Sequence, residues 1–591
     1  MSKIKYKVTI LFLVLLTSFS YSQQKFIVDL SDTTGHIFKI TLFPERLTEK
    51  NRIYQFAASA PGTYELMDIG RFVRSFHAYD GNGKEIQTNQ KSTNQWEISR
   101  PTRTKKLEYL ISDTWHANVK DHAIFMMAGS SLEKDNSLIN GHCIFGYFEG
   151  MQSEPIYIKI KTPSGWKIGT PLNKNKNGYF IAENYDRVVD SPILAGRLSE
   201  AGTKIGKCLI KIYTYSKTDL LKSSGILNSV TDILNAEDNF TKGLPVDHYT
   251  FLFHFENITN GAWEHNYSSE YIYKEDSLTD LYKENLRTVI SHEFFHIITP
   301  LNIHSQIIEP FNFVNPVMSQ HLWFYEGTTE WAAWILQLRA GIMSLDDYVK
   351  GLKRQMIMSD YFNKNLSLRD LSINAYKFPD QYQNIYMKGP VTAALLDILI
   401  LKLSGGKRGL REVILELAKK YGVNKAFEEN DFYDEIVSMT YPEVKTFLYK
   451  YIIRSDSLPL KEYLNWLGIV YQEFNGVDSS KIDLGFGLSV ANNRIVVSNV
   501  PDTNSTKMRE GDIINKLFTT TLTLENVQDA FMVMYGKKPG DILKFTLTRN
   551  GKDFEVDWKL PAAKRKHNFE IIKFPNPDQL ALRNAWMKNL P

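Results

Sequence analysis

Hydrophobic residues change their spacing twice along this chain of 591 residues. From residue 24 to about 200, short stretches such as "HIFKITLF" and "PIYIKIKT" alternate apolar and polar residues, as strands of an antiparallel sandwich do. From about 215 to 470, apolar residues recur every three or four positions, which is typical of helices. Alternation returns from about 478 to 560. A chain of this length with such changes is expected to form several domains rather than one core.

We therefore predict a multidomain α+β protein. Its parts are a leader, an N-terminal antiparallel β-sandwich, a mostly α-helical domain, a small β domain and a C-terminal extension. The predicted boundaries of these five parts are, in order, 1–22, 23–200, 201–475, 476–562 and 563–591.

The first 22 residues have the pattern of an export signal. A basic start, "MSKIKYK", precedes an apolar run of about a dozen residues, and small residues follow at Ser20 and Ser22. The run is shorter than the roughly 20 residues of a spanning helix. We expect the mature chain to be periplasmic or secreted and free of the membrane. Removal of the leader would lower the formal charge from +4 to about +1, and without a basic tract no nucleic-acid partner is predicted.

The stretch "VISHEFFHIITPLNIH", residues 289–304, is the strongest candidate for a metal site. His292 and His296 are four residues apart in a helical pattern that Pro300 is expected to end, so both imidazoles can bind one ion. Glu293 is offset around the helix and could take a proton from water that zinc acidifies. The alternative is a helix with two buried histidines and a chance glutamate.

Spacing distinguishes the candidates for a third ligand. His304 lies eight residues beyond His296 with no glycine between them, which does not match the metzincin spacing. Glu309 lies in a segment that Pro310 and its aromatic neighbours mark as a loop. Glu326 lies at the entry to an apolar helix, with twenty-nine residues between it and His296. Glu326 is therefore the best candidate.

Two further observations bear on this site. Glu330 is one helical turn beyond Glu326, where it could orient a metal ligand or be a solvated acid. Cys143 and Cys208 are the only cysteines, which excludes a cysteine-rich metal site. The sequence leaves open whether these two cysteines pair.

Four motifs, which follow one another along the chain in the right order, resemble the glycyl aminopeptidase family of zinc metallopeptidases. One of them consists of "HEFFH", the gap of twenty-nine residues and "LWFYEG". "NGAWEHNYSS" (260–269) is similar to the family's Gly-Gly-Leu-Glu-His segment, although without that motif it would be interpreted as a loop. "IYMKGPVTAALLDILI" (385–400) resembles the family's Tyr-x-Lys-Gly helix start, and "DRVVDSPILAG" (186–196) resembles its interdomain junction. The resemblance covers essentially the whole mature chain.

The resemblance implies one Zn²⁺ ion with three ligands, His292, His296 and Glu326. Glu293 would be the general base, and Tyr386 would donate a hydrogen bond to the developing oxyanion. Glu264 would receive the free α-ammonium group of the substrate. Gly261 and Ala262 are small, which suits an extended substrate that passes close to the backbone.

Two departures from the family pattern concern substrate contacts. The basic run that commonly follows the second histidine is absent from "IITPLNIHSQIIEP". Trp263 stands beside Glu264 where the family has a smaller aliphatic residue. The family's preference for an N-terminal glycine therefore does not transfer directly.

The segment "DLGFGLSV", residues 483–490, resembles the carboxylate-binding loop and strand of a PDZ module, which this family carries. Gly485, Phe486, Gly487 and Leu488 would then contact the C-terminus of a peptide. The alternative is a packing domain with an occluded groove. The extension that follows could dock on the body or lie loose.

These inferences converge on an exported zinc aminopeptidase of the thermolysin-like, glutamate-liganded type. Its substrates would be peptides with a free amino end and a small first residue, such as glycine or alanine. Two alternatives remain. One is a zinc endopeptidase that uses the same site and in which Glu264 has no clamping role. The other is a non-catalytic scaffold that binds peptide termini through its PDZ-like groove.

Overall fold

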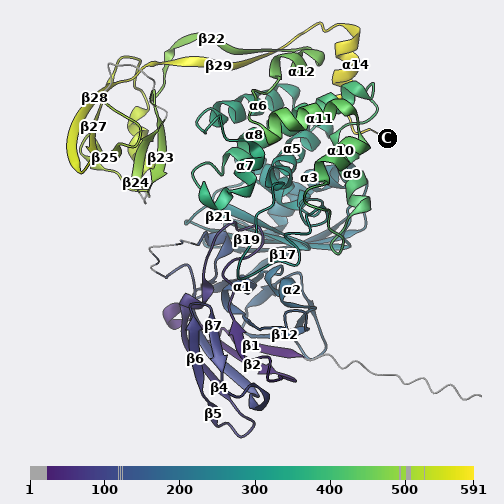
Figure 1. Cartoon of the computed structure of the whole chain (residues 1–591), viewed down its shortest axis with the longest axis vertical. Coiled ribbons are helices and arrows are strands. Elements are labelled where there is room, and N and C mark those ends of the chain that lie inside the picture. Colours follow the sequence, from purple (N-terminus) through teal and green to yellow (C-terminus); the bar gives the residue numbers. More distant parts are fainter. Residues whose placement is uncertain are drawn as a thin grey trace, which may run out of the picture.

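A computed structural model describes residues 23–590, apart from residues 118, 120, 121, 123, 492, 493, 499, 501–506 and 525. The predicted export signal therefore lies outside the described residues. Figure 1 shows a β-rich N-terminal body, a helical middle body stacked on it, and a small β body held beside the helices. The predicted multidomain α+β architecture is confirmed at this level.

Two sheets of the N-terminal body form a sandwich. The larger sheet has eight strands in the order β14-β15-β12-β1-β2-β8-β4-β5, and the smaller has four in the order β11-β3-β7-β6. The strands of the larger sheet are β1 (Gln24–Asp29), β2 (Ile37–Pro44), β4 (Val73–Tyr79), β5 (Glu85–Ile86), β8 (Lys106–Ser112), β12 (Ile156–Lys161), β14 (Asn173–Lys174) and β15 (Phe180–Ala182). Those of the smaller sheet are β3 (Ile53–Gln55), β6 (Thr88–Ser92), β7 (Gln95–Ile98) and β11 (Tyr147–Phe148). Their alternating apolar residues meet in one core, where Phe76 of β4 stacks on Trp96 of β7.

The large sheet is not antiparallel throughout, which corrects the sequence prediction. Strand β1 pairs antiparallel with β2 on one side and parallel with β12 on the other. β2 follows β1 directly and can turn back beside it. β12 arrives only after a long excursion through the second sheet, so a parallel arrangement is open to it.

A third sheet joins the N-terminal body to the middle body. It has the order β13-β16-β10-β9. Its strands are β9 (Ser131–Leu132), β10 (Asn136–Ile139), β13 (Lys167–Gly169) and β16 (Ile193–Gly196). Leu138 and Leu194 of this sheet pack on Tyr215 and Leu252 of the middle body in a separate hydrophobic cluster. The two bodies therefore share a dry, apolar contact.

One side chain of the middle body also crosses this boundary into the N-terminal core. Phe313 belongs to the long loop between two helices of the middle body, yet it is buried in the N-terminal core against Tyr185, at 4.9 Å between ring centroids. The backbone N–H of Ala58 donates to the Phe313 carbonyl at 2.7 Å. The loop is thus fixed to the N-terminal body.

The middle body opens with a mixed five-stranded sheet of order β17-β18-β19-β21-β20, which the helical prediction did not include. β18 and β19, and β19 and β21, pair in parallel. The strands are β17 (Ser199–Ile205), β18 (Cys208–Ser216), β19 (His248–Glu256), β20 (Gly261–His265) and β21 (Ser268–Lys274). Strand β20 is an edge strand of this sheet.

Helices make up the rest of the middle body (Figure 1). They are α3 (Ser223–Thr241), α4 (Asp280–Phe295), α5 (Leu322–Arg339), α6 (Leu345–Ser359), α7 (Leu368–Ile373), α8 (Asn384–Leu403), α9 (Leu410–Lys420), α10 (Phe432–Met439), α11 (Pro442–Leu448) and α12 (Leu460–Trp466). Among the described residues, α8 alone is long and apolar enough to cross a bilayer, and 83% of its apolar window is buried within the protein. It is the central helix of the bundle, because it contacts α5, α6 and α12.

The two cysteines do not pair. Cys143 is buried in the N-terminal core and Cys208 in the core of the middle body, and both are free thiols. Burial raises the pKa of both thiols, that of Cys208 to about 12. Both groups therefore behave as small core residues.

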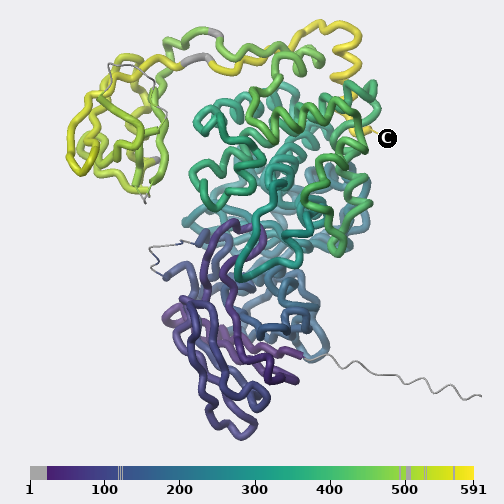
Figure 2. Tube along the Cα trace, viewed as in Figure 1, coloured from purple at the N-terminus to yellow at the C-terminus, as the bar shows by residue number. Residues whose placement is uncertain are grey.

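A two-stranded ribbon carries the third body. Strand β22 (Ile469–Ile482) leaves the helices and β29 (Ala562–Ile571) returns to them, paired antiparallel along most of their length (Figure 2). Between them lies a six-stranded sheet with β23-β24-β25-β27-β28 in line and β26 beside β25. Its elements are β23 (Gly487–Ala491), β24 (Arg494–Ser498), β25 (Ile513–Leu517), β26 (Thr520–Thr521), α13 (Val527–Phe531), β27 (Ile542–Arg549) and β28 (Lys552–Lys559).

The C-terminal extension docks on the helices. Helix α14 (Pro577–Trp586) buries Leu582 and Trp586 in the core of the middle body. Arg339 of α5 donates to the Trp586 carbonyl at 2.9 Å. The sequence left open whether this extension docks on the body or lies loose, and the structure shows that it docks.

Candidate active site

Helix α4 presents two histidines to one side. Thr279 caps its start by accepting a hydrogen bond from the Tyr282 N–H. His292 lies in the last turn, and His296 is the C-cap residue, which keeps a right-handed helical conformation. The two side chains are therefore one turn apart. They are 8% and 1% exposed, so their ring nitrogens are shielded from bulk water.

Glu326 of helix α5 completes a group of three possible ligands. Its Oε2 atom lies 3.5 Å from Nε2 of His292 and 3.6 Å from Nε2 of His296. Two ligands of a tetrahedral zinc ion lie about 3.4 Å apart. Although burial opposes ionisation, the two histidines hold the pKa of Glu326 below its ordinary value. Oε2 thus lies from each histidine nitrogen at the separation that one zinc ion requires, and the three ligand atoms lie within 4.8 Å of one another.

The other nitrogen of each histidine has a partner that fixes its ring. Nδ1 of His292 lies 2.8 Å from Oε2 of Glu330, and Oε1 of Glu330 accepts from Trp334 Nε1 at 2.9 Å. Nδ1 of His296 lies 2.9 Å from the Thr299 carbonyl. Metal-binding histidines are held in this way, with Nε2 left free for the ion. The residues present therefore fit a zinc ion.

Glu293 lies beside these three candidates and belongs to a second group of possible ligands that overlaps with them at His296. It follows His292 on α4, and its carboxylate, that of Glu264 and a ring nitrogen of His296 lie within 4.8 Å of one another. Burial raises the pKa of Glu293 to about 7. A carboxyl group with this pKa can both accept and release a proton near neutral pH.

Glu264 comes from strand β20, where the sequence alone suggested a loop. The strand pairs antiparallel with β21, so its side chains alternate between two faces. Trp263 faces the N-terminal core, and a Cβ atom on Gly261 would lie 3.0 Å from Sδ of Met127. Ala262 instead packs with the core of the middle body. Gly261 thus has a structural reason to be small, and Glu264 lies on the face toward the metal ligands.

Tyr386 lies in the first turn of α8, beside His292. Its ring centroid is 5.8 Å from that of His292. Its hydroxyl bonds to Glu326 and lies 2.9 Å from the hydroxyl of Tyr382. Burial raises the pKa of both phenols well above the ordinary value, so both are neutral donors at physiological pH.

Two parts of the chain match known domains by sequence. Residues 25–197 match the Peptidase M61 N-terminal domain, and residues 285–391 match the M61 glycyl aminopeptidase domain. The chain belongs to the M61 glycyl aminopeptidase family. The second match spans the zinc-ligand candidates and Tyr386. As a member of the M61 family, the protein is a metallo-aminopeptidase.

One solved structure shows the same fold over almost the whole chain. An aminopeptidase N family protein from Idiomarina loihiensis superposes with a TM-score of 0.77 at 20% identity, over 96% of this chain and 100% of that one. An M1 zinc metallopeptidase from Deinococcus radiodurans is more distant, with a TM-score of 0.48 at 11% identity over 74% of this chain and 95% of that one. No curated protein matches the M61 chain by sequence.

One residue near the zinc-ligand candidates of the M61 chain has no signal in the sequence. Tyr64, from the N-terminal body, donates a hydrogen bond from its hydroxyl to Oε1 of Glu326 at 3.1 Å. Its ring lies 5.7 Å from that of Tyr382. No local spacing could have identified it, because 262 positions separate it from Glu326.

The two other residues that were considered as a third ligand, His304 and Glu309, lie apart from the candidate ligands. His304 and Glu309 form an ion pair with each other, and Nδ1 of His304 lies 3.2 Å from the Pro300 carbonyl. Neither belongs to the groups of possible ligands found among the described residues. Glu330, by contrast, contacts Nδ1 of His292, which favours the ligand-orienting alternative over a solvated acid.

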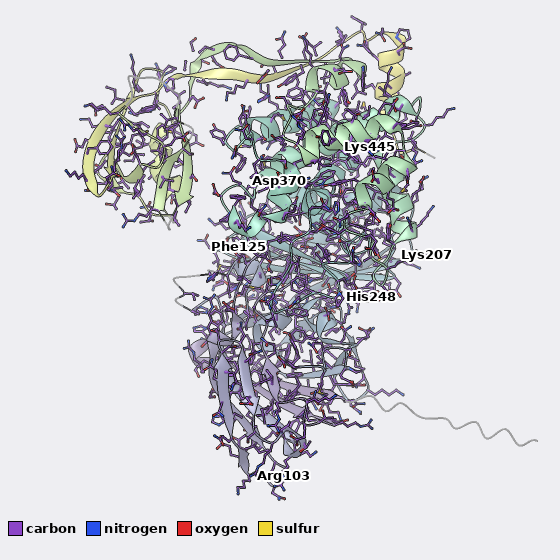
Figure 3. The ribbon with its side chains drawn as sticks, in the orientation of Figure 1. Arg103, Phe125, Lys207, His248, Asp370 and Lys445 are labelled. Carbon is purple, nitrogen blue, oxygen red and sulfur yellow. The ribbon has the colours of Figure 1, made fainter. Side chains whose placement is uncertain are left out.

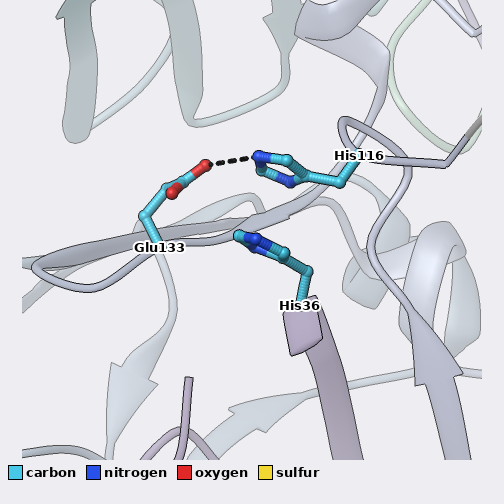
Figure 4. Close-up of side chains that lie close together, drawn as sticks. All are labelled: His36, His116 and Glu133. Atoms are coloured by element: carbon cyan, nitrogen blue, oxygen red, sulfur yellow. Dashed lines mark ion pairs between the residues drawn. The ribbon is translucent and has the colours of Figure 1, made fainter. Parts of the chain in front are cut away.

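A second histidine group lies in the N-terminal body (Figure 4). The rings of His36 and His116 are stacked at 3.6 Å with 14° between their planes, and Glu133 lies 3.2 Å from Nε2 of His116. Nδ1 of His116 also lies 2.8 Å from the buried carboxylate of Asp113. Two stacked rings cannot both direct a lone pair at one ion. We assign this group to ion pairing rather than to metal binding.

The predicted carboxylate-binding loop has a mixed environment. Gly485 has a φ of +82°, and its N–H donates to Asp483 at 2.9 Å. Phe486 is 4% exposed and packs on Trp558, so it is a core residue. Gly487 begins strand β23, and Leu488 on that strand is 40% exposed. Gly487 and Leu488 are therefore on an accessible edge strand, whereas Phe486 is not available to a ligand.

Proposed function

We propose that the protein is an exported zinc aminopeptidase that removes small first residues from peptides. The observation that carries this proposal is the convergence of Glu326 Oε2 on Nε2 of His292 and of His296, with Glu264 close by. One Zn²⁺ ion held by these three ligands would supply Lewis-acid chemistry, acidifying water and polarising a carbonyl group.

The side chains around the ligands suit the hydrolysis of a peptide bond. Glu293 would take a proton from water and pass it to the leaving amine. Tyr386, held as a neutral phenol, can donate to the oxygen of the scissile carbonyl as negative charge develops there. Both groups flank the same ligand set, so one substrate position can reach both.

Three carboxylates favour a cationic substrate end. Glu264, Glu293 and Glu326 lie close together, and burial raises the pKa of Glu264 well above its ordinary value, with the charges of the other two acting in the same direction. An ammonium group beside Glu264 would offset this repulsion and form a charge-assisted hydrogen bond.

The first residue of the substrate has little room behind Glu264. A Cβ atom on Gly62 of the N-terminal body would lie 2.7 Å from Oε1 of Glu264, so the backbone closes that side. A longer chain cannot extend past this point. The closure supports an aminopeptidase over an endopeptidase.

A matched pair of substrates tests the proposal. Alanyl-p-nitroanilide should be hydrolysed and its N-acetylated form should not, and a chelator should abolish the reaction. Cleavage of both compounds would retain the zinc chemistry but show an endopeptidase without a clamp. Cleavage of neither compound, nor of longer unblocked peptides, would contradict the proposal.

The small β body supports a second, separate proposal. We infer that it is a PDZ-type module that receives a peptide C-terminus by strand addition. β23 is an edge strand of its sheet in the described part of the chain, and Leu488 and Val490 on it are 40% and 51% exposed. Titration with a peptide that has a free C-terminal carboxylate, against its amide, would test this. Equal binding of the two forms would contradict it.

Export is also a proposal, and it rests on the leader pattern of residues 1–22. Sequencing the N-terminus of the protein from its native cells should show a start near Gln23. An intact Met1 start in a cytoplasmic fraction would exclude export.

A further inference from the structure

We propose that Tyr64 of the N-terminal body positions Glu326 and completes the zinc site across the domain boundary. The proposal rests on the proposed function in one respect, namely that zinc binds at His292, His296 and Glu326. It goes further by assigning an orienting partner to the third ligand. It also gives the N-terminal body a part in metal binding.

The two oxygens of Glu326 have different surroundings. Oε2 lies 3.5 and 3.6 Å from the two histidine nitrogens, whereas Oε1 accepts a hydrogen bond from the Tyr64 hydroxyl at 3.1 Å. Among the described residues, the Tyr64 hydroxyl makes this one hydrogen bond. A carboxylate held in this way would offer Oε2 to the ion while Oε1 is engaged with Tyr64. Tyr64 thereby selects monodentate binding.

Each zinc ligand then has its own orienting partner. Glu330 holds His292 and the Thr299 carbonyl holds His296, and both partners belong to the middle body. Glu326 bonds to Tyr386 of the middle body and, through Oε1, to Tyr64, which comes from the other body. Such outer partners strongly affect the affinity of a metal site.

The segment that carries Tyr64 is held by several contacts. Residues Ala60 to Thr63 form a tight turn, with the Thr63 N–H and hydroxyl 3.3 and 2.7 Å from the Ala60 carbonyl. The Ser59 hydroxyl donates to the Glu65 carbonyl at 2.6 Å on the far side of Tyr64. The Glu65 carboxylate accepts from the backbone of Phe125, which Figure 3 places where the two bodies meet.

Tyr64 itself has a backbone φ of +51°, a left-handed conformation that residues with a side chain rarely adopt. Strained positions of this kind persist where the surrounding structure holds them, and they often serve a site. Here the conformation coincides with a hydrogen bond to a candidate metal ligand. A tyrosine that served only as packing would have no need of it.

Zinc affinity of the full-length protein is the direct test. Wild type, Tyr64→Phe and Tyr382→Phe would be stripped of metal and titrated with Zn²⁺ against a competing chromogenic chelator. Tyr64→Phe keeps the ring and loses the hydrogen bond, so its Kd for zinc should rise about 10- to 100-fold. Tyr382→Phe loses a nearby hydroxyl that contacts Tyr386, and it should bind zinc as the wild type does.

Cobalt provides a readout of geometry. Without the Tyr64 hydroxyl, both Glu326 oxygens can approach the ion, which raises its coordination number and weakens the visible absorption of bound Co²⁺. Tyr382→Phe should keep the wild-type spectrum. Wild-type zinc affinity and a wild-type cobalt spectrum in Tyr64→Phe would overturn the proposal. Failure of the wild type itself to bind zinc would instead overturn the proposed function, so the two failures are distinguishable.

Discussion

Gly327 and Gly389 face each other where helices α5 and α8 cross. A Cβ atom on Gly327 would lie 2.9 Å from Cα of Gly389, so the two backbones touch. Gly327 directly follows Glu326, and Gly389 lies three residues beyond Tyr386. The contact therefore sets the distance between the third ligand and the proposed oxyanion donor.

A Gly327→Ala substitution should push the two helices apart. We expect a loss of about 1–3 kcal/mol in the free energy of unfolding, as overpacking usually costs, together with weaker zinc binding. Thermal unfolding and a chelator competition would measure both. Gly225→Ala in helix α3 is the matched control, because its Cβ meets only the end of Leu278 at 3.3 Å. If the two variants have the same stability and the same zinc affinity, the crossing of α5 and α8 can accommodate an added methyl group.

Glu293→Gln should remove turnover and leave the metal site intact. Loss of a general base costs about 10²- to 10⁴-fold in kcat, whereas zinc binding should persist because Glu293 is not a ligand. Metal content and p-nitroanilide hydrolysis of the same preparation would be compared. Glu284→Gln, on the exposed face of the same helix, should keep full activity. Turnover of Glu293→Gln close to that of the wild type would exclude this role.

Glu264→Gln should reduce the preference for a free amino group. A hydrogen bond to a charged group contributes about 1.5–3 kcal/mol, which corresponds to about 10- to 100-fold in kcat/KM. We expect this loss for alanyl-p-nitroanilide with an unchanged zinc content, while its N-acetylated form stays uncleaved by wild type and variant alike. A fall in zinc content as large as the fall in kcat/KM would mean that Glu264 supports the site without binding the ammonium group.

Glu330→Ala should weaken zinc binding by about 10- to 100-fold, because the His292 ring loses the partner that orients it. Trp334→Phe removes only the indole donor to the other oxygen of Glu330, so a smaller loss is expected. Chelator competition would rank the three proteins. An unchanged affinity in Glu330→Ala would show that helix packing alone orients His292.

His265 should make the domain boundary sensitive to acid. The residue is 3% exposed beside Trp263, and burial lowers its pKa from 6.5 to about 3. Below pH 6.5 the unfolded chain binds a proton that the folded chain excludes, so stability falls as the pH drops toward 3. The loss is about 1.4 kcal/mol per pH unit, or about 2 kcal/mol between pH 6.5 and 5.

Hydrogen exchange of residues 261–268, corrected for intrinsic rates, would report this loss. His265→Phe should flatten the pH dependence, because it has no group to protonate. His248→Phe, at the partly exposed start of strand β19, should retain it. A slope that survives in His265→Phe would assign the acid sensitivity to other groups.

The zinc-ligand candidates could be predicted from sequence because their spacing is local. His292 and His296 are one helical turn apart, and an aromatic run marks the helix that carries Glu326. The five-stranded sheet could not be predicted in the same way. Strand β19 is buried along nearly its whole length between parallel neighbours, so "HYTFLFHFE" shows no clear alternation.

Two other parts of the site depend on long-range structure. Strand β20 is five residues long and starts with a glycine, so its sequence favours a loop until β21 pairs with it. Tyr64 reaches Glu326 only because the two bodies are packed together. Neither position carries a periodic signal.

Phe313 ties the stability of the two bodies together. This ring of the middle body is buried in the N-terminal core, while Tyr64 of the N-terminal body reaches the zinc ligands. Separation of the two bodies would expose Phe313 to water and, in the same step, remove Tyr64 from the zinc ligands. We therefore expect N-terminal unfolding and metal release to appear as one cooperative transition in calorimetry. A fragment that lacks the N-terminal body would have an incomplete core as well as an incomplete metal site.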